Sequence, residues 1–164
     1  MHRRRFLMGA GTVGLGNIPA QALQKLTPGM IPPPFSRAGL DGKPVDLAAF
    51  NGKVVLLDFW ASWCAPCMVA IPHFRDLQAR LRGRGFQVIG ISMDDSADQA
   101  RAAAIRLGVN YPVVMGDAKL AIGYGGILGL PVEMLVGRDG RIVSIWRGET
   151  PPAIIENAVK ASLG

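Results

Sequence analysis

Cysteine is scarce in this sequence of 164 residues, and the two cysteines that it contains, Cys64 and Cys67, lie only three positions apart. A disulfide that stabilises a fold does so mainly by closing a long loop, and this pair closes almost none. The spacing therefore argues against a structural cross-link and favours reactive chemistry or metal binding at the pair.

The sequence also lacks a basic cluster beyond its N-terminus. Three of its 18 Lys and Arg residues are Arg3, Arg4 and Arg5, and residues 1–22 contain no acidic residue. The remainder has 15 basic and 12 acidic residues, a net charge of +3. So small an excess does not favour nucleic acid as a partner. Apolar residues make up 49% of the chain, so we expect one packed domain.

No apolar run near the N-terminus is long enough to cross a bilayer of about 30 Å as a helix. Residues 1–22 instead have the three parts of an export signal: a basic start, a glycine-rich apolar run, and Ala20-Gln21-Ala22 as a signal-peptidase site. Arg3-Arg4-Arg5-Phe6-Leu7 resembles the twin-arginine signal. We expect residues 1–22 to be a twin-arginine-like signal peptide and the protein to be periplasmic or extracytoplasmic. A general secretory signal and an uncleaved anchor remain alternatives.

The order of the expected elements predicts an α/β domain. Residues 23–34 are rich in proline and predict an extended linker ahead of a domain at 35–164. Asp41-Gly42 predicts a hairpin with Val45 and Leu47 on its returning strand. Buried strands are expected at 54–60, 86–92 and 111–115, a hairpin at 132–136 and 141–146, and helices at 65–82, 97–107, 118–124 and 152–162. This order indicates a central mixed sheet with helices on both faces.

The cysteines follow directly on the first buried strand and stand where a helix begins. A helix N-terminus stabilises a thiolate, so we expect Cys64 to be the nucleophile. Cys67, one turn further along, is placed to attack a mixed disulfide and release the product. Pro66 keeps the first turn rigid and holds the two sulfurs at bonding distance, which predicts a Cys64–Cys67 disulfide.

Asp58 lies within the apolar run 54–60. A carboxyl buried there has a raised pKa and can exchange protons near neutral pH, so we expect Asp58 to deprotonate Cys67. The alternative is an edge strand with Asp58 in water. Pro131 begins a later strand; a cis bond before it would turn the Leu130 backbone toward the active site, where it could pair with a client peptide.

Trp63-Cys64-Ala65-Pro66-Cys67, preceded by Asp58-Phe59-Trp60-Ala61, resembles the thioredoxin active site. Pro72 matches the proline that kinks the helix of that family, and Pro131 matches its cis-proline. The longer frame, including Leu40 to Val45, Asn51 to Leu56 and Tyr111-Pro112-Val113, is similar to the exported TlpA/ResA/DsbE-type branch. Two departures are Val132-Glu133-Met134 after the proline and Ala65 between the cysteines.

This resemblance implies a thioredoxin-like fold, three α/β/α layers with an N-terminal β-hairpin extension. It also implies a disulfide reductase of exported client proteins, in some members of apocytochrome c, supplied with electrons by a membrane donor of the DsbD or CcdA type. Clients are expected to dock against Trp63, Pro66, Leu130 and Pro131. No cofactor and no metal ligand is assigned.

Two other activities use the same cysteines. A copper-binding metallochaperone-like module would pair their thiolates with His73, although the sequence has no Met-rich or His-rich tract. A peroxiredoxin-like peroxidase would need Thr or Ser three residues before Cys64 and Pro seven before it. Ala61 and Leu57 occupy those positions.

Overall fold

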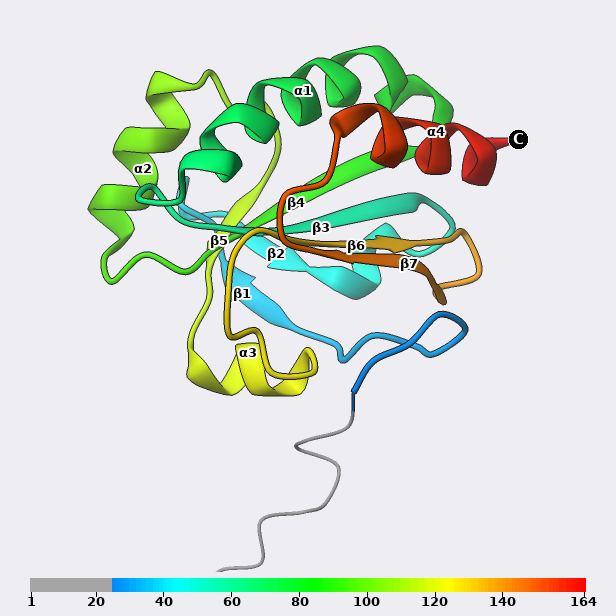
Figure 1. Cartoon of the computed structure of the whole chain (residues 1–164), viewed down its shortest axis with the longest axis horizontal. Helices are drawn as coiled ribbons and strands as arrows, with labels where there is room; N and C mark the ends of the chain where they lie inside the picture. Colours follow the sequence, from blue (N-terminus) through cyan, green and yellow to red (C-terminus); the bar gives the residue numbers. More distant parts are fainter. Residues whose placement is uncertain (1–24) are drawn as a thin grey trace, which may run out of the picture.

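A five-stranded sheet in the order β5-β4-β3-β6-β7 runs through the middle of residues 25–164, the part of the chain that this computed structural model describes (Figure 1). Its strands are β3 (Val54–Trp60), β4 (Phe86–Ser92), β5 (Val113–Met115), β6 (Val132–Val136) and β7 (Ile142–Arg147). The first three are parallel, whereas β6 is antiparallel to β3 and β7 is antiparallel to β6. The sheet is therefore mixed, as the sequence predicts.

β3 occupies the centre of the sheet, and all seven of its residues are buried. Its Val and Leu side chains suit a strand that is covered on both faces. β4, which pairs with it in parallel, is buried at every position except the half-buried Gln87. The prediction that 54–60 is an interior strand rather than an edge strand is confirmed.

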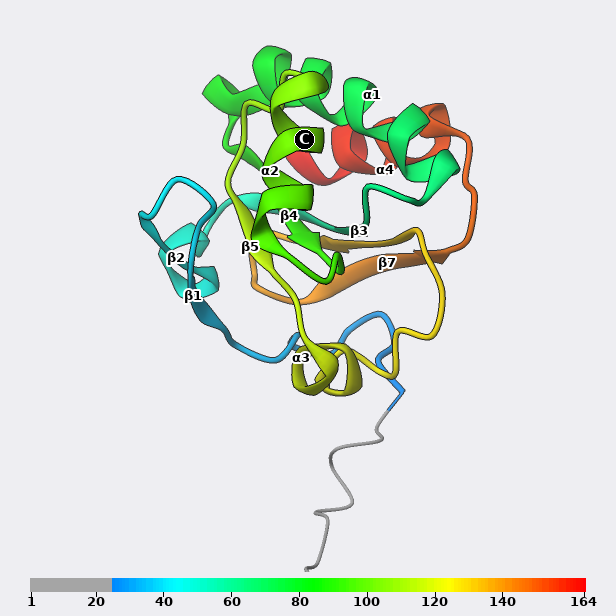
Figure 2. The same ribbon diagram turned by 90° about the vertical axis from the view of Figure 1, so that its left-hand side faces the viewer.

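Helices cover both faces of the sheet (Figures 1 and 2). One face packs against α1 (Ala65–Leu81), α2 (Ala97–Arg106) and α4 (Pro152–Leu163), whose buried residues share one core cluster with Leu56, Trp60 and Leu135. The other face packs against α3 (Ala118–Gly123) and the N-terminal segment, in a second cluster. The predicted three-layer α/β/α arrangement is confirmed.

The N-terminal hairpin consists of β1 (Ser36–Ala38) and β2 (Pro44–Asp46), which form a small sheet of their own. The prediction that Leu47 belongs to the returning strand is wrong, because a 3₁₀ helix, η2 (Leu47–Phe50), begins there. The Asp46 carboxylate accepts a hydrogen bond of 2.9 Å from the Ala48 N–H. This cap turns the chain out of the strand.

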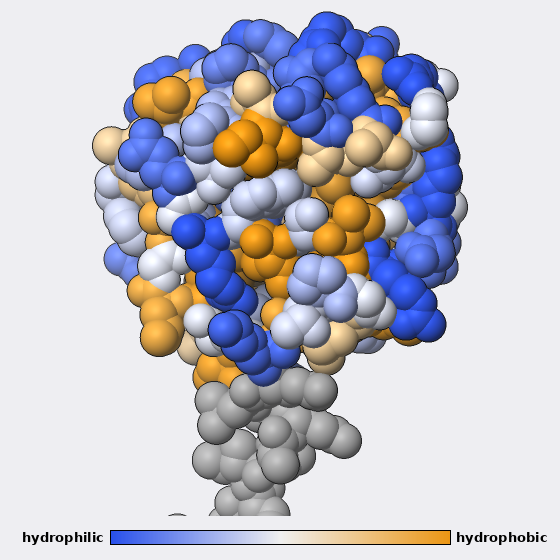
Figure 3. Space-filling view, turned by 45° about the vertical axis from the view of Figure 1, so that its right-hand side comes forward, coloured by the Kyte–Doolittle hydropathy of each residue, from blue (hydrophilic) through white to orange (hydrophobic). Residues whose placement is uncertain are grey.

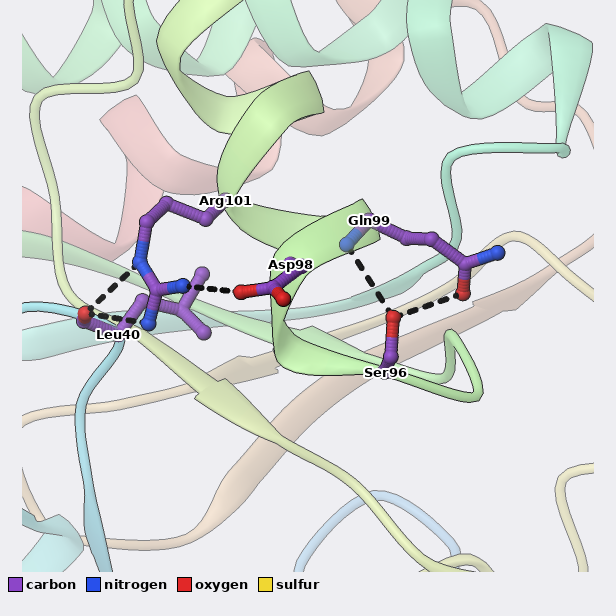
Figure 4. A network of polar contacts seen from close by, with 5 residues as sticks. All are labelled: Leu40, Ser96, Asp98, Gln99 and Arg101. Atoms are coloured by element: carbon purple, nitrogen blue, oxygen red, sulfur yellow. Dashed lines mark hydrogen bonds and ion pairs between the residues drawn. The ribbon is translucent and has the colours of Figure 1, made fainter.

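Contacts to β5 and α2 hold the hairpin to the main sheet. The Leu40 N–H donates to the Val113 carbonyl at 2.8 Å. Figure 4 shows the second tie: the Arg101 guanidinium donates to the Leu40 carbonyl at 3.3 and 3.4 Å, and also to the Asp98 carboxylate at 2.8 Å. Ser96 caps the same helix by accepting from the Gln99 N–H at 3.4 Å. Hairpin, β5 and α2 are thus joined at one edge of the domain.

The described part of the expected linker packs onto the domain. Leu26 is buried in the second core cluster. The Gly29 N–H donates to the Ile142 carbonyl, and the Ile142 N–H donates to the Met30 carbonyl, each at 2.8 Å. The segment therefore covers the start of β7 rather than standing free. The predicted signal peptide, residues 1–22, lies outside the described residues.

The surface of the domain is mixed, with hydrophobic residues gathered near the middle of the face in Figure 3 and hydrophilic ones around them. Trp63, Val69 and Leu128 are large apolar side chains that are more than two-thirds exposed. Within residues 25–164, no helix combines the length and the apolar character needed to span a bilayer.

Candidate active site

Cys64 and Cys67 form a disulfide at the start of α1, with their Cα atoms 5.3 Å apart. Cys64 is the N-cap of the helix, and its sulfur accepts a hydrogen bond of 3.3 Å from the Cys67 N–H. That N–H is one of those that a helix start leaves without a backbone partner, and it lies at the positive end of the helix dipole. The same N–H would stabilise a thiolate at Cys64 after reduction.

Both sulfurs are shielded in the oxidised protein. Cys64 is 4% exposed and Cys67 is 1% exposed, and both belong to the core cluster under α1. Cys64 lies nearer the surface because it caps the helix, whereas Cys67 lies one turn inside it. The order in which Cys64 meets the client and Cys67 resolves the mixed disulfide stays a prediction.

Apolar surface surrounds the pair. Trp63 is 68% exposed, and Pro66 is half-buried. Pro66 and Val69 line a hollow closed on its other side by residues 149–152. Leu130 and the fully exposed Leu128 line a second hollow with Lys25 and Arg147. Of the residues predicted to receive a client, Pro66 and Leu130 thus line hollows, Trp63 is exposed and Pro131 is buried.

The Leu130–Pro131 peptide bond is cis. Val132, the next residue, pairs with Phe59, so Pro131 lies at the end of β3 from which the chain runs on to Cys64. Leu130 packs against the core cluster that contains the cysteines. The structure thus brings together Cys64, Cys67 and the loop before β6, which are more than 60 residues apart in sequence.

Asp58 is 1% exposed and lies on the face of β3 that packs against α1, since its neighbours Leu56 and Trp60 belong to the cluster that contains Cys67. Burial raises the pKa of the Asp58 carboxyl well above its ordinary value, and the nearby Glu133 raises it further. The predicted burial is confirmed. The role of Asp58 toward Cys67 stays a prediction.

Glu133 is a second buried carboxyl that the sequence prediction did not assign to the site. It is 1% exposed, and it pairs with Asp58 across β3 and β6. Burial raises the pKa of Glu133 to about 7, although its own backbone N–H opposes the shift. The pattern that singled out Asp58, an acid within an apolar strand, also applies to Glu133 within Val132–Val136.

Asp94 is the other residue missing from the prediction. It is 5% exposed, and its carboxylate accepts hydrogen bonds from the Ser62 N–H, the Ser62 hydroxyl and the Ser92 hydroxyl. These bonds hold the loop between β3 and α1, which carries Trp63 and Cys64. No local pattern marks Asp94, because Ser62 lies 32 residues away.

The residues invoked by the two alternative activities lie as follows. His73 is exposed and follows Cys67 by six residues, which places the two about 120° apart around the axis of α1. Within residues 25–164 no group of three or more His, Cys, Asp and Glu side chains is arranged to hold a metal ion. Leu57 and Ala61, where a peroxidase would need Pro and a hydroxyl, are buried apolar residues.

The comparisons with known proteins agree with this geometry. The Redoxin family model matches residues 25–162. The chain belongs to the Redoxin family. It is 28% identical over 137 residues to the thiol-disulfide oxidoreductase ResA of Bacillus thuringiensis, covering 84% of this chain and 79% of that one. The ResA protein of Bacillus subtilis is 24% identical over 134 residues, 82% of this chain and 75% of that protein.

Solved structures match as well. A putative thiol:disulfide interchange protein DsbE from Chlorobium tepidum superposes with a TM-score of 0.80 and 31% identity, covering 85% of this chain and all of that one. A putative protein disulfide isomerase from Bacteroides thetaiotaomicron gives 0.77 and 30%, covering 84% and 91%. The predicted membership of the TlpA/ResA/DsbE type is confirmed, and so is the enzyme class, thiol–disulfide oxidoreductase.

Proposed function

We propose that this Redoxin-family chain is exported from the cytoplasm and reduces disulfides of other exported proteins through Cys64 and Cys67. The observation that best supports this proposal is the cysteine pair: it forms a disulfide at a helix N-terminus, with Cys64 as the N-cap and Cys67 buried in the first turn. The basic and apolar pattern of residues 1–22 supports export. An exported reductase has to be reduced again outside the cytoplasm after each reaction, so a membrane electron donor of the DsbD or CcdA type is the proposed partner.

The reaction starts from the reduced pair. The Cys64 thiolate attacks one sulfur of the client disulfide, the client S–S bond breaks, and the other client sulfur leaves as a thiolate. A mixed disulfide now joins Cys64 to the client. Cys67 then loses its proton and attacks the Cys64 sulfur, which releases the second client thiolate and forms the Cys64–Cys67 disulfide. Two electrons pass to the client, and its two thiolates take up protons from water.

The client is proposed to dock over Trp63 and Pro66, with its backbone beside Leu130 and Pro131. An extended client peptide is expected to pair with the Leu130 backbone, while its apolar side chains contact the Trp63 indole. The lining of the two hollows adds Glu149 on one side and Lys25 and Arg147 on the other. A basic client residue beside the disulfide would therefore meet Glu149 in one hollow, and an acidic one would meet Lys25 and Arg147 in the other.

Equilibration of the purified protein with glutathione and with dithiothreitol at pH 7 tests the direction of the reaction. We expect a reduction potential closer to that of thioredoxin, near −270 mV, than to that of DsbA, near −120 mV. Insulin reduction is then measured for the wild type and for Cys64→Ala, which should be inactive. A potential as oxidising as that of DsbA contradicts the reductase, and undiminished activity of Cys64→Ala contradicts the assignment of the nucleophile.

A further inference from the structure

Glu133 lies directly across the strand pair from Asp58. The register of β3 and β6 makes the two residues Cα partners, and each is 1% exposed. Directly opposed residues of antiparallel strands project from the same face, with Cβ atoms about 4.5–5.5 Å apart. That face is the one covered by α1, because Leu56 and Leu135, two positions along each strand, belong to the cluster that contains Cys67. Two carboxyl groups are therefore enclosed together in the layer beneath the disulfide.

Neither carboxyl group is fully bonded. The Oδ2 atom of Asp58 and the Oε2 atom of Glu133 are buried and have no hydrogen-bond partner among the described residues. The Tyr111 hydroxyl and the Trp60 indole N–H share this condition. Gly90 is the partner of Asp58 on β4, and a Cβ atom there would lie 3.0 Å from the Trp60 indole nitrogen and 3.4 Å from the Tyr111 ring. Asp58 thus lies between a carboxyl group on one side and two polar groups on the other.

We propose that Asp58 and Glu133 work as one unit that holds a single proton between them and accepts a second one from Cys67 in the resolving step. This inference rests on the proposed function. The proton of the Cys67 thiol passes to the ionised carboxylate of the pair as the Cys67 sulfur bonds to the Cys64 sulfur. The bond between Cys64 and the client breaks, and the client thiolate takes its proton from water. The pair afterwards returns one proton to solvent.

Electrostatics gives the reason for a shared proton. Two adjacent carboxylates in a medium of low dielectric constant repel strongly, so one of them stays protonated. The protonated partner can donate a hydrogen bond to the ionised one and so stabilise a single negative charge. A single buried carboxyl group lacks that donated hydrogen bond, so it ionises at a higher pH than the first ionisation of the pair. The repulsion by which Glu133 raises the pKa of Asp58 acts on the loss of the second proton. The pKa of about 7 for Glu133, with that of Asp58 raised further by Glu133, agrees with one charge on the pair near neutral pH.

Few other titratable groups face the pair from the elements packed around it. Tyr111, just before β5, is one, and its pKa is raised by burial and then by Asp58, with Arg75 opposing. Among the buried residues of α1, Cys67 is the one with a titratable side chain, and it belongs to the cluster on this face. From α4 the buried residues are the uncharged Ile155, Val159 and Leu163, while Glu156 is bound to Arg80 and Lys160 at the surface. On β7 the residue opposite Glu133 is Trp146. Within the described residues, Asp58 and Glu133 are therefore the buried carboxyl groups on the sheet face that packs against α1.

Stopped-flow mixing of the reduced protein with Ellman's reagent separates the two chemical steps. The first thionitrobenzoate released reports attack by Cys64, and the second reports attack by Cys67 on the mixed disulfide. Both rates are measured between pH 5.5 and 9 for the wild type, Glu133→Gln, Asp58→Asn and the double variant. Asp76→Asn, which removes an exposed carboxyl on the outer side of α1, is the matched control.

We expect Glu133→Gln to leave the pH profile of the first release unchanged. For the second release, the pH at which the rate rises should increase by about one unit. Near pH 6.5 the rate should therefore be about tenfold lower than in the wild type. Asp58→Asn should also shift this rise to higher pH, and the double variant should show no such rise in the second-release rate. Asp76→Asn should match the wild type in both steps.

A second-release profile of Glu133→Gln that superimposes on that of the wild type overturns the proposal and leaves Glu133 a structural residue. Equal shifts in both releases overturn it too, since the charge would then act on Cys64. If the wild-type thiols release no thionitrobenzoate at all, the proposed function fails instead, so the two failures are distinguishable.

Discussion

The carboxylate of Asp94 accepts hydrogen bonds from both the backbone N–H and the hydroxyl of Ser62, at 3.0 and 2.7 Å. Asp94 follows β4, and Ser62 follows β3, so the contact ties the ends of the two central parallel strands together. Trp63 and Cys64 come directly after Ser62. The position of the nucleophile therefore depends on a side chain that is bonded to the loop before it.

Removal of this carboxylate should loosen the loop before α1. Asp94→Ala leaves the Ser62 N–H without its partner, and we expect it to lower the free energy of unfolding by about 2 kcal/mol or more. Ser62→Ala removes only the hydroxyl bond and should cost about 1 kcal/mol. The rate of the first release from Ellman's reagent should fall more in Asp94→Ala than in Ser62→Ala. Urea unfolding and stopped-flow absorbance give the two measurements.

Asp95→Ala is the control for this series, because Asp95 is the exposed neighbour of Asp94. It should match the wild type in both stability and rate. A normal first-release rate in Asp94→Ala, despite reduced stability, would mean that Cys64 is held by the helix alone.

Stability of the oxidised protein should fall as the pH rises toward neutrality. Burial raises the pKa of Glu133 from 4.5 to about 7. Between these values the folded state keeps the proton and the unfolded state has lost it, so increasing pH favours unfolding. The shift corresponds to about 3 kcal/mol that is present near pH 4.5 and lost by about pH 7. Asp58, with its raised pKa, acts in the same direction.

Glu133→Gln removes this titration. Urea unfolding of oxidised protein at pH 5 and pH 7.5 should show a smaller loss of stability in the variant than in the wild type. Glu156, whose pKa is lowered to about 2, changes charge below this window and does not interfere. The exposed Asp76→Asn should keep the wild-type pH dependence. An identical loss in wild type and Glu133→Gln would mean that Glu133 reaches solvent in the folded protein.

The local sequence pattern predicts much of this fold, but it does not predict which residues distant in sequence contact each other. The bounds of β3 and β4 follow from two apolar runs, and Asp58 is recognisable because a charge in such a run is costly to bury. Glu133 lies in an equally apolar run, but its pairing with Asp58 depends on a register between strands 75 residues apart. Burial can be inferred from periodicity, whereas the identity of a cross-strand partner cannot.

The errors at element ends have local causes. Leu47 has the alternation expected of a strand, but the Asp46 side chain bonds to the Ala48 N–H and starts a 3₁₀ turn. Side-chain bonds to nearby backbone of this kind compete with strand pairing. The described part of the proline-rich segment 23–34 looks like a linker in composition, yet its backbone pairs with Ile142 on the edge of β7.

The exposed indole of Trp63 should serve client binding rather than stability. Trp63→Ala is expected to change the free energy of unfolding by less than about 0.5 kcal/mol, because the side chain is 68% exposed. The KM for a disulfide-containing client peptide should rise about tenfold, or about 1.4 kcal/mol, with little change in kcat. Ile105→Ala, at a side chain on α2 that is 74% exposed, is the control and should leave KM unchanged. Equal effects of the two variants would contradict a docking role for Trp63.

Gly90 should not accommodate a side chain, because the Trp60 indole and the Tyr111 ring lie next to its Cα atom, beside Asp58. A Cβ atom at Gly90 would lie 3.0 Å from the Trp60 indole nitrogen and 3.1 Å from the Val113 side chain. Gly90→Ala should therefore cost about 1–3 kcal/mol of stability and alter the near-ultraviolet circular dichroism of the buried indole. Gly83→Ala, where a Cβ atom meets nothing within 4 Å, is the matched control and should not destabilise the protein. If Gly90→Ala is as stable as Gly83→Ala, the space around Asp58 can accommodate an added methyl group, and the polar side chains there are not fixed by close packing.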